Sequence, residues 1–273
     1  MFIALITAAV AAPVPPNSVL NQPERPFRVE LNAEVGYLAP LQHTIKFGQD
    51  GSDINYITEG GQDNLFLVSR WSADLRLKNR SNFTFLYQPF DLETQQVANR
   101  DLLIDGVTFV EGTPMDFRYG FDFYRFSYGY DLFEDDRRDL EIGISLQIRN
   151  ATIAFASGDG TQRTITRDIG PVPILRTRGR FEGEQRTWWG FEVDGFYAPI
   201  KYLNGDSSDV VGAILDASVR AGLKANNGVE PFLNLRYLGG GGEGTSNDPD
   251  PGKDGYVENW LHVMTVTLGF SLR

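Results

Sequence analysis

From residue 27 onwards the chain alternates apolar and polar residues, and this alternation recurs in ten separate segments. Residues 140–149 are the clearest example, because isoleucines and leucines occupy every second position and polar residues or glycine the positions between them. A period of two is typical of a β-strand with one apolar and one polar face. No segment keeps a period of 3.6 residues, so the sequence predicts an all-β protein with very little helix.

The connections between these segments alternate in length. Short polar connections are expected at residues 78–81, 133–139, 182–185 and 225–228. Longer ones are expected at residues 40–64, 91–116, 151–171, 199–209 and 239–257. This order indicates antiparallel neighbours that run up and down, with short turns at one end and large loops at the other.

With these features the chain resembles the small outer-membrane β-barrels of Gram-negative bacteria over nearly all of its length. Tyrosine and tryptophan near the strand ends fit the aromatic girdles of that class. They are Tyr37, Trp71, Tyr87, Tyr130, Trp189, Tyr197, Tyr237 and Trp260. The last segment, MTVTLGFSLR, alternates as the final strand of such barrels does, although Phe270 lies three residues before the terminal Arg273. The resemblance implies an antiparallel up-and-down transmembrane barrel in a bacterial outer membrane.

We expect ten strands, with eight and twelve as the alternatives. The alternatives arise because the long connections contain alternating pieces, at residues 102–110 and 152–166. We interpret those pieces as hairpin extensions that stand above the membrane. A soluble sandwich or lipocalin-like barrel would also alternate. The polar face argues against it, because small residues beside long charged ones suit the interior of a membrane barrel.

Composition excludes several other classes. The chain of 273 residues has no cysteine, which excludes disulfides, thiolate metal sites and thiol nucleophiles. A net charge of −11 argues against nucleic acid as a partner, since that binding depends on Lys and Arg at phosphates. After residue 12 no window approaches the roughly 20 apolar residues of a helical membrane span.

The first residues predict export. Residues 2–12 form an apolar run, FIALITAAVAA, with small residues at Ala9 and Ala11 that suit signal cleavage. We therefore divide the chain into a signal peptide at 1–11, a proline-rich periplasmic lead-in at 12–26, and the outer-membrane barrel at 27–273. The expected partners are outer-membrane lipid and the barrel-assembly machinery, and we expect a monomer of porin-like architecture.

The polar faces predict a charged barrel interior. Arg176, Arg178 and Arg180 share one face, and Glu192 and Asp194 lie on the next strand. Asp216 and Arg220 continue the charged face on the strand after that. If Arg178 lies opposite Trp188, Arg176 lies opposite or diagonal to Glu192, within cross-strand reach. Unpaired charges in a narrow interior are costly, so we expect a paired network.

Two functions follow from this interior. The first is a structural or surface-interaction barrel with a mostly occluded lumen, and the alternative is a narrow channel or transporter for small anions lined by the arginines. A membrane enzyme ranks third, because His43 and His262 are the only histidines and no nucleophile motif occurs. No cofactor is expected, apart from a calcium ion that Asp248, Asp250 and Asp254 in the last long connection would ligate.

Overall fold

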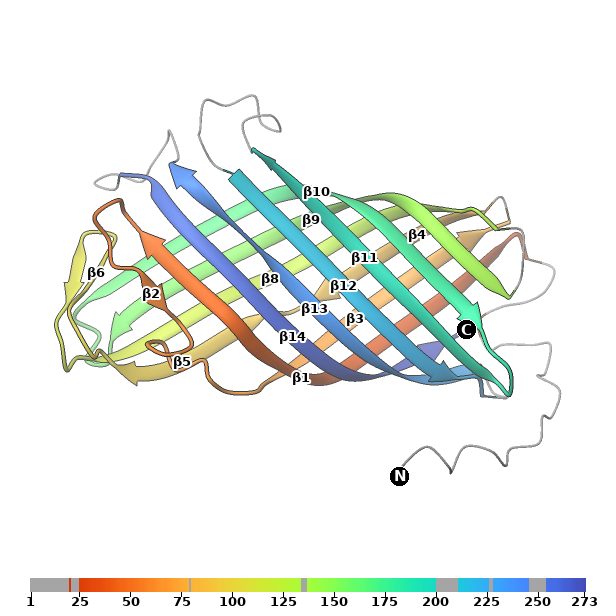
Figure 1. The fold of residues 1–273 in the computed structure, drawn as a ribbon, viewed down its shortest axis with the longest axis horizontal. Helices are drawn as coiled ribbons and strands as arrows, with labels where there is room; N and C mark the ends of the chain where they lie inside the picture. The colour runs from red at the N-terminus through yellow and green to blue at the C-terminus, as the bar shows by residue number, and fades with distance from the viewer. Residues whose placement is uncertain are drawn as a thin grey trace.

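The computed structural model describes residue 20 and residues 25–78, 80–133, 137–199, 211–225, 228–245 and 254–273. It shows one large antiparallel sheet of twelve strands that closes on itself, because β14 pairs with β1. Two of the twelve add no position around the barrel: β2 is a short strand beside β1, and β5 continues β4 along β8. The barrel therefore has ten strands, as the sequence predicts (Figure 1).

The strands around the barrel follow one another in chain order. They are β1 (Phe27–Phe47), β3 (Phe66–Leu77), β4 (Ser81–Gln88), β8 (Pro114–Asp131), β9 (Arg138–Ser157), β10 (Arg163–Glu182), β11 (Thr187–Pro199), β12 (Val211–Leu223), β13 (Val229–Thr245) and β14 (Tyr256–Leu272). The additional strands are β2 (Ile54–Asn55), β5 (Asp91–Val97) and the small hairpin of β6 (Leu102–Ile104) and β7 (Val107–Phe109). In the described part of the chain, no helix has the length and apolar character needed to span a membrane.

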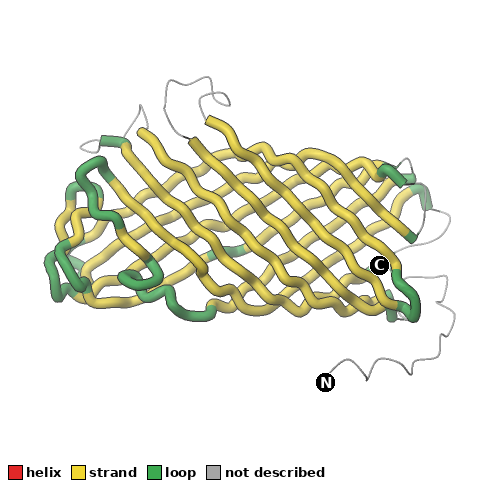
Figure 2. Tube along the Cα trace, viewed as in Figure 1, coloured by secondary structure: helices red, strands yellow, loops and turns green. Residues whose placement is uncertain are grey.

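Several long connections are partly strand rather than loop. β1 runs on to Phe47, and β9 and β10 stay paired as far as Ala156 and Arg163. The expectation of a loop from residue 40 and at residues 151–171 is therefore wrong, whereas the interpretation of 152–166 as a hairpin extension is confirmed. The extra length carries the barrel past the section with an apolar exterior, and Figure 2 shows loops gathered at the end where these extensions lie.

Two parts of the barrel differ in which face is apolar. We call residues 42–65, 89–122, 150–171, 239–245 and 254–261 the outer part, and the remaining barrel residues the membrane part. In the membrane part most of the large apolar side chains point outwards and are exposed, as with Ile144 at 62% and Leu268 at 46%, although Trp188 and Phe232 are buried. In the outer part they point inwards, as with Phe117 at 1% and Phe155 at 1%.

Strand β8 shows the exchange along a single element. Its inward positions are the buried aromatics Phe117, Tyr119 and Phe121 in the outer part, followed in the membrane part by Phe123 and the fully buried Arg125. Its outward positions change in the opposite sense, from the exposed Asp116 to the exposed Phe126. Because the strand is continuous, the change marks the level at which the environment of the outer surface changes from water to hydrocarbon.

Strand β1 makes the same exchange with a β-bulge. Its register against β14 shifts between Pro40 and Gln42, so that the inward positions change from even to odd numbers. Leu38 is buried on the even side of the shift, and His43 is buried on the odd side. One extra residue is what a bulge inserts. A strict period of two therefore fails to place the residues beyond Leu41.

Candidate functional site

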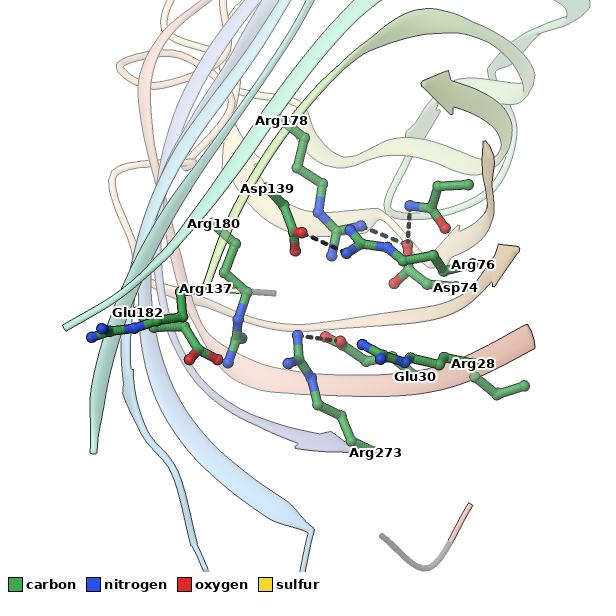
Figure 3. Close-up of a pocket in the computed structure, with 12 residues that line it drawn as sticks. Arg28, Glu30, Asp74, Arg76, Arg137, Asp139, Arg178, Arg180, Glu182 and Arg273 are labelled. Atoms are coloured by element: carbon green, nitrogen blue, oxygen red, sulfur yellow. Dashed lines mark hydrogen bonds and ion pairs between the residues drawn. The ribbon is translucent and has the colours of Figure 1, made fainter. Parts of the chain in front are cut away.

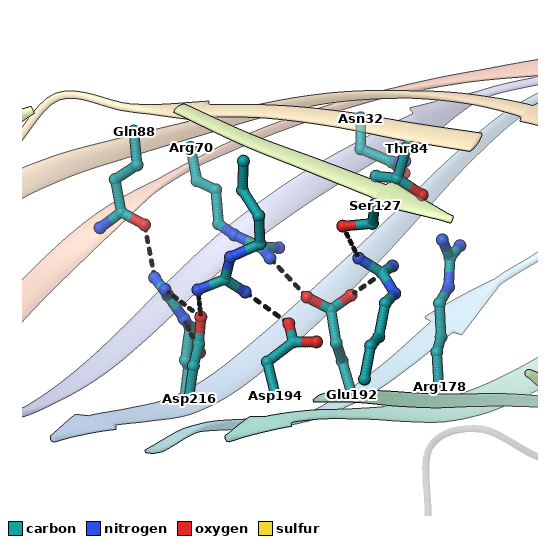
Figure 4. A network of polar contacts seen from close by, with 12 residues as sticks. Asn32, Arg70, Thr84, Gln88, Ser127, Arg178, Glu192, Asp194 and Asp216 are labelled. Carbon is teal, nitrogen blue, oxygen red and sulfur yellow. Dashed lines mark hydrogen bonds and ion pairs between the residues drawn. The ribbon is translucent and has the colours of Figure 1, made fainter. Parts of the chain in front are cut away.

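The interior of the membrane part is a network of buried charges that reach across the barrel (Figure 4). Arg125 on β8 is its centre, with a side chain that is fully buried. Its guanidinium donates to Gln147 Oε1 at 2.7 and 3.0 Å and forms an ion pair with Asp194 on β11. It also reaches Asp216 on β12 at 2.9 Å. The contacts thus join strands that are far apart in the order of the barrel wall.

Asp216 is shared by two arginines. Arg236 on β13 donates Nε and Nη2 to the two carboxylate oxygens of Asp216, at 2.5 and 2.7 Å. The same guanidinium donates Nη1 to Gln88 Oε1 on β4 at 2.5 Å. Two parallel N–H···O bonds fix a guanidinium both in position and in plane. The Arg236 side chain is therefore held in one position and links β13 to β4.

Glu192 on β11 is the acidic centre of the other half. Arg70 on β3 donates to Glu192 at 2.8 Å and to Glu34 at 3.1 Å. Arg176 lies 3.5 Å from Glu192 and donates to the hydroxyl of Ser127 at 2.8 Å. Arg220 completes the group, at 3.4 Å from Glu34 and 3.8 Å from Glu192. Each carboxylate thus faces more than one guanidinium.

The register between β10 and β11 differs from the one expected. Arg178 lies opposite Glu192, not opposite Trp188, and Arg176 lies opposite Asp194 and diagonal to Glu192. Arg178 nevertheless forms its short ion pair with Asp74 on β3, at 2.5 Å across the interior. Arg180 pairs with Glu230 on β13 at 2.6 Å. Closure of the barrel brings these partners together, and a sequence shows only neighbours along the wall.

The seven residues selected from the sequence all lie inside the barrel, but they are part of a larger set. The other members are Glu34, Arg70, Asp74, Arg125, Gln147, Glu230 and Arg236. Each occupies a polar position in an alternating segment, so the alternation also assigns it to the interior. Only the shared contacts across the interior distinguish Arg125 as the centre.

The outer part is filled differently, by an apolar core that the sequence analysis missed. Tyr56 and Ile54 from the segment after β1 and Ile104 and Phe109 from the β6–β7 hairpin are buried against the barrel wall. The signal was present in the sequence, because Phe117, Tyr119, Phe121 and Phe123 alternate with polar residues or glycine in the phase opposite to Tyr124 and Phe126. We call this core the outer plug.

His43 lies in the outer plug, not in a loop as expected. Its Nδ1 lies 2.7 Å from Gln62 Oε1, and its ring stacks on Tyr56 with centroids 4.3 Å apart. Burial lowers the pKa of His43 to about 4, although the Gln62 hydrogen bond opposes the shift. The ring is therefore neutral near pH 7 and fastens the segment after β1 to the strand. His262 lies on the last strand, with Nδ1 2.5 Å from the hydroxyl of Tyr237.

The calcium ligands proposed from the sequence are only partly within the described residues. Asp248 and Asp250 lie outside them. The Asp254 carboxylate accepts backbone N–H groups of Gln49 at 2.6 Å and Tyr256 at 2.9 Å. The hydrogen bond from Gln49 lowers the pKa of Asp254, which is exposed. Among the described residues no three acidic or histidine side chains form a group that could hold a metal ion. The calcium site stays a prediction.

Three solved structures illustrate what the chain is similar to. They are the protease OmpT from Escherichia coli (12% identity over 89% of this chain and 96% of that chain, TM-score 0.46), a FadL homologue from Pseudomonas aeruginosa (9%, 89% and 89%, 0.40), and Ail, the attachment invasion locus protein of Yersinia pestis (10%, 89% and 98%, 0.30). No protein-family model and no curated protein matches the chain. At these identities no residue role transfers.

Proposed function

We propose that the chain is a bacterial outer-membrane barrel protein with a closed lumen, whose outer part serves as a rigid surface for interaction. The observation that carries the proposal is the exchange of apolar and polar faces along β8 and β1. A barrel with an exposed apolar belt around a buried charged interior is unstable in water and stable in a bilayer. The signal peptide, the outer-membrane location and the barrel-assembly machinery as partner belong to this proposal.

Two observations support a closed lumen. Arg125, Arg70 and Arg236 each span the interior of the membrane part and end on residues of distant strands. Above them the outer plug adds a second, apolar seal. A solute path would have to break several charge-assisted hydrogen bonds and displace packed aromatic side chains as well. The narrow anion channel is therefore the second candidate, and it rests on the arginine-rich interior.

The outer part has the composition of an interaction surface in contact with water. Its segments contain 16 acidic and 5 basic residues, which gives a net charge of −11. This equals the net charge of the whole chain, so the other residues balance one another. Such a surface attracts cationic groups and divalent ions, and it repels other acidic surfaces.

Planar-bilayer recordings test the proposal. We expect the purified wild-type barrel to insert without conductance steps. A variant with Arg125→Ala, Asp194→Ala and Asp216→Ala removes the central contacts and should leak more than a matched variant with Asp116→Ala and Arg118→Ala on the outer wall. Steady anion-selective current through the wild type would refute the closed lumen and favour the channel.

A further inference from the structure

A cavity of about 220 Å³ lies inside the barrel at the inner end, where the short connections are. The polar network of the preceding sections borders the cavity on the side of the outer part, since Asp74 and Arg178 belong to both. Six arginines from β1, β3, β10, a short turn and the chain terminus line it (Figure 3). They are Arg28, Arg76, Arg137, Arg178, Arg180 and Arg273.

Positive charge exceeds negative charge on the lining. Four carboxylates, of Glu30, Asp74, Asp139 and Glu182, face the six arginines. Guanidinium groups stay protonated at all physiological pH values, so the arginines that line the cavity keep their charge.

Two of the arginines lie near one carboxylate. Arg180 Nη2 donates to Glu230 Oε2 at 2.6 Å, and Arg273 Nε lies 3.8 Å from the same oxygen while its Nη2 pairs with Glu30 at 2.5 Å. The Nε atoms of Arg180 and Arg273 are both buried and have no hydrogen-bond partner. The Arg180 side chain is only 7% exposed. Figure 3 shows the two guanidinium groups approaching the same space, one from β10 and one from the chain end.

We propose that this cavity binds a small oxyanion with more than one negative charge, and that a phosphate group is the ligand chemistry. A buried N–H without a partner is costly, and a second acceptor between Arg180 and Arg273 would remove that cost. Phosphate oxygens match the fork of a guanidinium and carry negative charge, which suits a lining with six arginines and four carboxylates. At about 220 Å³ the cavity holds several times the roughly 30 Å³ of one liquid water.

The ligand enters and leaves from the inner side. The Arg178–Asp74 pair and the Glu192 contacts lie above the cavity and close it towards the outer part. The cavity is therefore a binding site and not a section of a channel. The phosphate group belongs either to a free ion or to the headgroup of a lipid or soluble ester on the inner side.

Calorimetric titration of the purified full-length barrel in detergent tests the site. Inorganic phosphate should bind with a stoichiometry near one, against sodium chloride at equal ionic strength. Arg273→Gln and Arg180→Gln should each weaken binding by about tenfold or more, because each removes a charged donor. Arg118→Gln, on the exposed outer wall beside Asp91, is the matched control and should bind as the wild type does. Melting curves identify any variant that fails to fold, and Arg28→Gln then replaces it.

Two further titrations identify the source of the phosphate group. Competition by glycerol 3-phosphate supports a small ester, competition by short-chain phosphatidic acid in the micelle supports a lipid headgroup, and competition by neither supports the free ion. The titration extends to about 10 mM phosphate, and the absence of saturable binding with a Kd of about 1 mM or tighter overturns the proposal. So does equal affinity in the wild type and in a folded Arg273→Gln variant.

Discussion

The membrane part and the outer part have the same strands and opposite interiors. In the membrane part, Arg125 and Glu192 are buried while Ile144 and Leu268 are exposed. In the outer part, Phe117 and Phe155 are buried while Asp116 and Arg118 are exposed. The medium outside determines which face can be apolar, and the interior takes the other face. The inward-facing side of a strand can thus be predicted correctly only when the surroundings of each section are known.

The largest effect should come from breaking the charged interior of the membrane part. Glu192→Ala leaves Arg70, Arg176 and Arg220 without their shared carboxylate. We expect a loss of about 3 to 5 kcal/mol in the free energy of unfolding, because an uncompensated buried charge is costly. The double variant with Arg176→Ala should lose less than the sum of the single variants. Denaturant unfolding in detergent measures all three.

Near-neutral behaviour of Glu192→Ala would show that water screens these charges. The barrel interior would then be wet, and the contrast with the outer plug would be one of hydration and not of packing. Asp116→Ala, in an exposed position on the outer wall, is the control and should change the free energy of unfolding by less than about 0.5 kcal/mol.

A cavity in the outer plug should lower the free energy of unfolding by a similar amount, but only within the outer part. Phe117→Ala removes a ring that is 1% exposed and contacts Tyr56 and Phe155. We expect a loss of about 3 to 5 kcal/mol within the outer part. Hydrogen exchange should quicken at β5 and at the β6–β7 hairpin while β12 stays protected. Uniform quickening across the barrel would contradict two separate cores.

A charge introduced on the outer surface of the barrel should lower the free energy of unfolding only in the membrane part. Ile144→Arg places a guanidinium on an exposed position in the membrane part and should cost about 2 to 4 kcal/mol in lipid vesicles. Thr44→Arg, on the outward side of β1 in the outer part, should be nearly neutral. Wild-type stability of Ile144→Arg in vesicles would support a soluble barrel instead.

The smallest effect concerns pH and His43. Burial lowers the pKa of His43 in the folded protein to about 4, so the unfolded chain binds the proton first as the pH falls. Stability from this residue is complete above about pH 6.5 and declines towards pH 4. We expect a loss of about 1 kcal/mol between pH 7 and pH 5.5. Hydrogen exchange at residues 54–62 measures it, and His43→Gln should remove this contribution to the pH dependence.

Local pattern predicted the wall of the barrel well. The alternation at residues 140–149 placed Ile144 outwards and Glu141 inwards, as the structure has them, and the short connections fall where polar residues interrupt the pattern. It failed where the period itself changes, at the bulge beside Leu41, and where the medium changes, between Phe123 and Tyr124. Neither change is visible to a rule that assigns one apolar face to each strand.

The interior contacts were the least predictable feature. Cross-strand reasoning considered Arg176 and Glu192 on adjacent strands, and the two do lie 3.5 Å apart. It could not find that Arg178 pairs with Asp74, because β3 and β10 are neighbours only across the barrel interior. That distance depends on strand number and tilt, which fix the width of the closed barrel.

The closure between β1 and β14 also determines when the outer plug can form. Gln49 bonds to Asp254, 205 residues later, and Tyr119 accepts a hydrogen bond from Asn259 across 140 residues. Contacts so distant in sequence form late, since the entropy of the intervening loop is lost before any contact is gained. Contacts of the first strand with the last therefore form late. The outer plug should be the final region to become protected from hydrogen exchange during folding.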